Sequence, residues 1–140
     1  MSTSSASAKN IQRKWHFIDA KDQILGRLAT GVAKILMGKN KVNFVSYLDQ
    51  GDYVVITNAS KIKLTGKKAA TKTYITHSGY PGGKKERPFK KVMAEQPTRI
   101  IEHAVKGMLP KNKLGRQMIK KLKVFADDTN PYQDKMKEEK

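Results

Sequence analysis

The sequence predicts one α/β domain built around a parallel sheet. Residues Trp15–Asp19 (WHFID) have the composition of a strand, Ile24–Met37 repeat apolar residues with helical spacing, and Tyr53–Thr57 (YVVIT) is a continuous apolar run. A continuous run of this length is typical of a strand covered on both faces. A strand, a helix and a covered strand form a βαβ unit, which joins parallel strands by a right-handed crossover.

Length and composition set the domain organisation. A chain of 140 residues has room for one modest core and not for two. We therefore expect a single domain at residues 13–126, a disordered lead at residues 1–12 and a polar, mobile tail at residues 127–140. The lead (MSTSSASAKN at its start) lacks the apolar stretch of a secretory signal, so an intracellular location is the default.

The first helix has the clearest pattern in the chain. Its predicted core face consists of Leu25, Leu28, Ala29, Val32, Ile35 and Leu36. We expect a cap near Asp22 and an end at Gly38, because glycine commonly terminates helices. Residues 38–52 then form a long loop.

Signals beyond Thr57 are weaker. Ile62 and Leu64 alternate with lysines, which predicts an edge strand or an extended segment. Thr73–His77 (TYITH) predicts another strand, and the glycines and prolines of Ser78–Pro88 (SGYPGGKKERP) predict a loop. Further helices are predicted at Phe89–Glu95, from Pro97 to about Leu109 and from Leu114, with a last strand at Lys123–Ala126.

The charge balance predicts a polyanionic partner. The formal net charge is +17, and it rises to +19 when residues 127–140, with five acidic and three basic side chains, are set aside. Such a surface favours nucleic acid first and an anionic membrane second. The chain has no apolar run near the ~18 residues that a spanning helix needs, so nucleic acid is the better prediction.

Lys106–Lys123 (KGMLPKNKLGRQMIKKLK) is the most concentrated basic stretch, with seven basic side chains and no acidic one. A solvated helix face usually mixes both signs of charge, whereas this stretch does not. A helical wheel places Leu114, Met118, Ile119 and Leu122 on one face, and Lys113, Arg116, Lys120 and Lys123 on the other. We therefore predict an apolar face that packs against the core, the anchored face, and a basic face open to a partner, the offered face.

A second basic region, Lys61–Lys91, has ten Lys and Arg residues and Glu86 as its sole acid. Within it, Gly79–Lys85 combines glycines, whose backbone can approach phosphate closely, with two lysines and Tyr80. By itself this could equally be an ordinary surface loop; beside another basic block it favours an RNA or DNA contact. Tyr80 or His77 could stack on an unpaired base.

Motifs for catalysis, metals and small-molecule cofactors are missing from the sequence. Neither MGKNK nor LTGKKAATK matches a P-loop, and the first strand-to-helix turn lacks GxGxxG. Asp49 and Asp52 could pair on a metal, but two carboxylates around a glycine are more often turn and cap residues. The histidines lack ligand spacing and there is no cysteine, so we predict no catalytic site, no metal and no cofactor.

Four stretches carry a family resemblance: WHFIDAKDQILGRLAT, GDYVVITNASKIKLTGKK, HSGYPGGKKERPF and VKGMLPKNKLGRQMIKKLKVFA, which together span roughly residues 13–126. In this order they resemble the ribosomal protein uL13 (L13) family of the bacterial large subunit. The resemblance implies a three-layer α/β/α fold with a four-stranded parallel sheet. It also implies binding to large-subunit (23S-type) rRNA beside neighbouring ribosomal proteins, and a place in early assembly.

Carried over by position, the resemblance also implies which residues face RNA. They are Lys39, Lys41, Lys67, Lys68, His77, Tyr80, Gly82, Gly83, Lys84, Lys85, Lys106, Lys111, Lys113, Arg116, Lys120 and Lys121.

Two segments depart from the family pattern. Many members carry GKHK followed by Thr-Pro-His, whereas this chain has GKNK followed by Phe44, Val45, Ser46 and Tyr47. The ending ADDTNPYQDKMKEEK is also unusual. Phosphate repels its acids, so we expect the tail from Asp127 onward not to lie along RNA.

Three functions compete on this reading. A structural rRNA-binding protein of the cytoplasmic large ribosomal subunit is favoured. A metal-dependent nuclease using Asp49 and Asp52 is the alternative from another class. A regulatory mRNA-binding role would use the same basic surface, and the sequence does not separate it from the first.

Overall fold

A βαβ unit forms the centre of the molecule. In the computed structural model, which describes residues 6–138, strand β1 (Trp15–Asp19), helix α1 (Leu25–Met37) and strand β2 (Tyr53–Thr57) follow one another. β1 and β2 pair in parallel, with Trp15 opposite Tyr53 and Asp19 opposite Thr57. The predicted parallel arrangement is confirmed.

The parallel sheet has three strands and not the four implied by the family resemblance. Strand β5 (Leu122–Val124) pairs with β2, giving the order β1-β2-β5. The central place of β2 explains its unbroken apolar run, since Val54, Val55 and Ile56 have no exposed surface. The Ile62–Leu64 segment makes one isolated bridge, between Lys63 and Ile24. The Lys63 backbone bonds to the Gln23 carbonyl and the Leu25 amide, where α1 begins, and not to a strand of the sheet.

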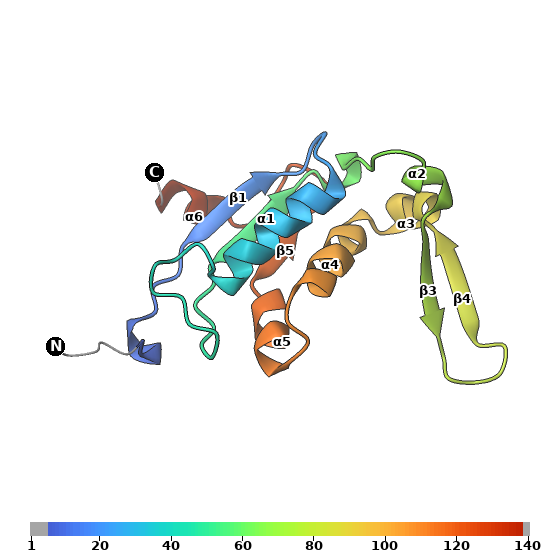
Figure 1. The fold of residues 1–140 in the computed structure, drawn as a ribbon. Coiled ribbons are helices and arrows are strands. Elements are labelled where there is room, and N and C mark those ends of the chain that lie inside the picture. Colours follow the sequence, from blue (N-terminus) through green and yellow to red (C-terminus); the bar gives the residue numbers. More distant parts are fainter. Residues whose placement is uncertain (1–5, 139–140) are drawn as a thin grey trace.

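An antiparallel hairpin projects from the body (Figure 1). It consists of strand β3 (Thr73–His77), as predicted, and strand β4 (Lys84–Pro88). The prediction of a loop over all of Ser78–Pro88 is therefore wrong in its second half. The strand KKERP gives no apolar alternation because all five of its residues are exposed, and its backbone pairs with β3.

Helices cover one face of the sheet. α1 lies beside α4 (Pro97–Met108), as Figure 1 shows, and α4 follows the short helix α3 (Phe89–Glu95). The core between helices and sheet contains Leu28, Val32, Leu36, Val54, Ile56, Ile100, Ile101 and Val105. Single turns, α2 (Lys68–Thr71), η1 (Ala8–Asn10) and η2 (Ala59–Lys61), complete this part of the chain.

The boundaries of α1 were predicted well at one end. Gly38 ends the helix in the left-handed conformation, with φ of 78°, as expected. Asp22 is not the cap, however: Ile24 occupies that position, and the Asp22 carboxylate pairs with Lys63 at 2.6 Å.

The basic helix is shorter than predicted. α5 spans Lys113–Ile119, and Lys123 lies in β5. The helical wheel therefore holds for Lys113, Arg116 and the C-cap Lys120 but not for Lys123. Directly after the C-cap, Lys121 is buried and its ammonium donates to the Gly51 carbonyl.

Aromatic side chains line the other face of the sheet. Trp15 stacks on Tyr53, with ring centroids 4.5 Å apart, and on Tyr132, 5.2 Å away. Tyr132 precedes α6 (Gln133–Glu138), which lies beside β1 in Figure 1. Mobility of the tail stays a prediction, but its described residues contact the folded body through Tyr132.

Candidate nucleic-acid interface

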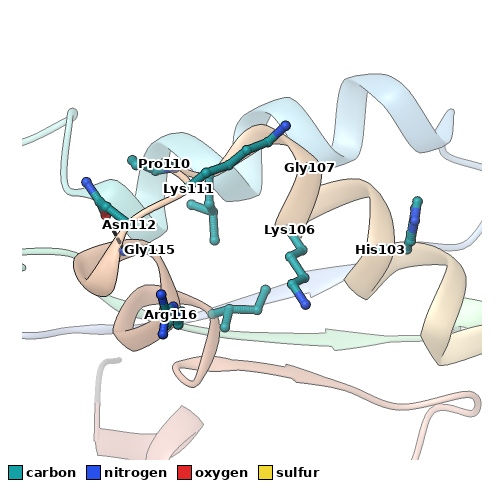
Figure 2. Close-up of a pocket in the computed structure, with 10 residues that line it drawn as sticks. His103, Lys106, Gly107, Pro110, Lys111, Asn112, Gly115 and Arg116 are labelled. Carbon is teal, nitrogen blue, oxygen red and sulfur yellow. Dashed lines mark hydrogen bonds between the residues drawn. The ribbon is translucent and has the colours of Figure 1, made fainter. Parts of the chain in front are cut away.

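An open groove of about 530 Å³ lies between α4 and α5 (Figure 2). The groove falls on the stretch KGMLPKNKLGR, which the sequence singled out as the main binding candidate. Ten residues line it: His103, Lys106, Gly107, Leu109, Pro110, Lys111, Asn112, Gly115, Arg116 and Ile119.

Three residues determine the shape of the turn between α4 and α5. Pro110 cannot continue a helix, and Asn112 caps α5 by accepting a hydrogen bond from the Gly115 backbone at 2.9 Å. A Cβ at Gly115 would stand 1.8 Å from the Pro110 carbonyl oxygen, so this close approach requires glycine. The turn is thus packed tightly against α5, which fixes the groove's geometry.

Basic residues surround the groove while apolar residues anchor its walls. Lys106, Lys111 and Arg116 are exposed, whereas Leu109 and Met118 are 4% exposed and belong to the core. In Figure 2 the side chains of Lys106 and Arg116 reach the same side of the groove from different helices, and Lys111 points away from them. Within α5, Arg116 is exposed and Met118 is buried, as the helical wheel predicts for these two residues.

His103 connects this groove to the base of the hairpin. It also lines a smaller hollow of about 110 Å³ with Tyr74, Arg87 and Arg99, and its ring meets Tyr74 edge-on at 5.4 Å. Sequence reasoning missed Arg87 and Arg99. Arg99, His103 and Lys106 lie at helical spacings i, i+4 and i+7, a signal that could have placed Arg99 on the offered face.

The hairpin tip uses its glycines mainly for its own geometry. Gly79 and Gly82 have positive φ, of 85° and 71°. The Gly83 amide donates to the Tyr80 carbonyl, and the Gly79 amide donates to His77 Nδ1. These two amides therefore hold the turn, whereas Tyr80, 76% exposed, is presented to solvent.

The other predicted contact residues are spread over several elements. Lys39, Lys67, Lys68, Lys84 and Lys85 are exposed, as are Lys113 and Lys120. Lys84 pairs with Glu86 on its own strand at 2.6 Å. The groove and the hairpin base are joined through His103; Lys39 and the Lys67–Lys68 pair lie on other segments.

Lys41 and Lys121 differ from the other predicted contact residues, because their ammonium groups bond to groups of the protein itself. Lys41 Nζ lies 2.6 Å from Asp52 Oδ1 and donates to the carbonyls of Gln12 and Gln50. Lys121 is 6% exposed and its Nζ contacts Asp49 Oδ1 and the Gly51 carbonyl. We leave both residues out of the proposed interface.

Asp49 and Asp52 serve the same internal network. Asp52 accepts from the Lys14 amide at 3.0 Å and from His16 Nε2 at 2.9 Å, besides Lys41. Burial alone would raise the pKa of Asp52, but the hydrogen bonds from Lys41, Lys14 and His16 outweigh it and hold that pKa below its usual value. Burial lowers the pKa of Lys121, which the Asp49 carboxylate offsets only in part.

This network gives no support to the alternative of a metal-dependent nuclease that uses Asp49 and Asp52. Both carboxylates already face cations, and residues 6–138 contain no cluster of three His, Cys, Asp or Glu side chains arranged for a metal. Across the same residues, no helix has the length and apolarity to cross a membrane.

Residues 13–131, which include the groove and the hairpin, match the model of the family described as ribosomal protein L13. The chain belongs to the uL13 family. It is 56% identical to large ribosomal subunit protein uL13 of Desulfitobacterium hafniense (strain DSM 10664 / DCB-2) over 133 residues, 95% of this chain and 93% of the relative. The uL13 proteins of Thermobifida fusca and Chlorobium limicola are 53% and 52% identical, over 95% and 93% of this chain and 89% and 87% of the relatives. The uL13 family is one of ribosomal proteins and not of enzymes.

Proposed function

We propose that this protein is a structural component of the large ribosomal subunit that binds 23S-type rRNA and supports early subunit assembly. It acts in the cytoplasm, on the ribosome, among neighbouring large-subunit proteins. The observation that carries the proposal is the groove between α4 and α5, where exposed cations surround a rigid turn in a chain of the uL13 family.

The physical basis is attraction between phosphates and outward-facing cations. Lys106, Lys111 and Arg116 surround the groove, Lys113 and Lys120 extend the surface along α5, and Arg87 and Arg99 continue it toward the hairpin. Each phosphate contact releases counterions, so binding gains free energy without reading sequence. The hairpin adds Lys84, Lys85 and the exposed ring of Tyr80, which can stack on an unpaired base.

Reconstitution of large subunits tests this proposal. The wild-type protein is expected to sediment with large subunits through a moderate salt wash. Replacing Lys113, Arg116 and Lys120 with Glu should reduce incorporation at least about ten-fold, since each reversal replaces attraction with repulsion. These side chains are exposed, so the variant should unfold at nearly the wild-type urea concentration.

A matched control reverses three exposed cations outside the groove and outside both basic regions, Lys21, Arg27 and Lys34. It makes the same change in net charge and is expected to incorporate much better than the first variant. Equal losses in both variants would show that net charge and not this face governs binding. Wild-type protein found solely in ribosome-free fractions would exclude the ribosomal role.

A further inference from the structure

We propose that the groove between α4 and α5 holds a single unpaired nucleotide of the bound RNA, with its base inside the groove and its flanking phosphates on Lys106 and Arg116. This inference rests on the proposed RNA-binding function and goes beyond it, because it assigns base contact to a surface otherwise read as a phosphate contact.

The size of the groove and the nature of its walls favour a base. Its volume of about 530 Å³ falls within the roughly 300–1,000 Å³ typical of pockets for small organic ligands. Leu109, Pro110 and Ile119 contribute apolar surface to its walls. A phosphate alone would gain nothing from such walls, whereas a flat, largely apolar base that leaves a stack would be removed from water.

The surrounding charge favours a nucleotide over an apolar side chain of a protein. Lys106 and Arg116 approach the same side of the groove (Figure 2), and none of the ten lining residues is acidic. The Arg116 guanidinium is planar, so it can stack on a base as well as pair with a phosphate. A neutral peptide segment would use neither property.

The turn supplies the rigidity that such a site needs. Asn112 Oδ1 accepts a hydrogen bond from the Gly115 amide. Gly115 lies so close to the Pro110 carbonyl that no side chain would fit there. The walls are therefore set before RNA arrives, which lowers the ordering cost of binding.

Gly107 allows the groove to be filled without removing a contact or a charge. It lines the groove, and a Cβ built there meets no atom within 4 Å. Gly107→Leu therefore places a side chain in the space assigned to the base. Gly31→Leu is the matched control, because Gly31 lies in α1 and has the same open surroundings.

The experiment compares two fluorescent single strands of equal length, an oligoadenylate and an abasic strand with the same ribose-phosphate backbone, by anisotropy at fixed salt. For the wild type and Gly31→Leu, we expect the abasic strand to bind at least about five-fold more weakly, given the usual effect of one well-packed base. For Gly107→Leu, that ratio should fall clearly below the wild-type ratio, with any remainder due to stacking on Tyr80, while abasic binding changes less than about two-fold. Lys106→Gln should weaken both strands and leave the ratio unchanged.

Three outcomes would overturn the inference. A wild-type ratio near one, with RNA still bound, would mean that the groove takes phosphate alone or a protein segment. A ratio that Gly107→Leu leaves unchanged would place the base contact elsewhere, for example at Tyr80. Absence of binding to either strand would instead contradict the proposed RNA-binding function itself.

Discussion

The basic side chains of this protein fall into two groups that differ in exposure. Lys41 and Lys121 turn inward to Asp52 and Asp49, whereas Lys106 and Arg116 turn outward beside the groove. Burying an ammonium is costly unless a carboxylate and further acceptors surround it, and each inward lysine has both. Gly51 is part of the same arrangement, because a Cβ there would stand 2.8 Å from Lys121 Nζ and 1.7 Å from the Leu36 carbonyl oxygen.

Replacing Asp52 with Asn should destabilise the fold in a pH-dependent way. Asn keeps an acceptor for the Lys14 amide but leaves Lys41 without its carboxylate, so we expect a loss of about 3 kcal/mol at pH 7. The folded pKa of Asp52 is lowered, so its stabilisation is complete above the unfolded value of about 3.9 and is lost as pH falls through the folded value. The difference from wild type should therefore narrow below about pH 4.

Urea unfolding at several pH values, followed by the fluorescence of Trp15, measures this difference. Asp128→Asn is a suitable control because Asp128 is exposed, and it should change stability by less than about 0.5 kcal/mol at any of these pH values. A variant at Asp52 as stable as wild type at pH 7 would show that the network contributes nothing.

At the scale of elements, the helices and strands that bury apolar residues were predictable, and so was the mostly exposed strand β3, whose TYITH sequence is rich in strand-forming residues. The periods of α1 and α4 and the run of β2 follow directly from their contacts with one core. β4 escaped prediction because its five exposed residues carry no burial pattern. The inward turn of Lys121 also left no signal, since its partner Asp49 lies 72 residues away in sequence.

The aromatic face of the sheet predicts a role for the C-terminal segment. Tyr132→Ala removes the ring that stacks on Trp15 at 5.2 Å, so we expect a loss of about 1–2 kcal/mol in the free energy of unfolding. Trp15 is the sole tryptophan, and its emission should shift to longer wavelength as water reaches it. Met136→Ala, at a residue 43% exposed, should leave emission unchanged. Identical emission in wild type and Tyr132→Ala would instead favour the detached, mobile tail that composition predicts.

At the scale of the whole molecule, net charge indicated the class of partner but not the surface. A net charge of +17 favours a polyanion whichever way each lysine points. The contact surface depends on the fold, which joins α4, α5 and the hairpin base through His103. Residues from 74 to 119 meet there, so the cations that share this surface come from parts of the chain that are distant in sequence.

The salt dependence of RNA binding measures how many cations point outward. For a single-stranded RNA, the slope of log K against log salt is about −0.7 for each phosphate neutralised. Lys106→Gln combined with Arg116→Gln should therefore make the slope shallower by about 1.4. Lys41→Gln combined with Lys121→Gln removes the same charge, yet it should leave the slope unchanged in protein that remains folded, because those ammonium groups are held by Asp52 and Asp49. Anisotropy titrations at four or more salt concentrations give the slopes, and equal changes in the two double variants would contradict the division into inward and outward cations.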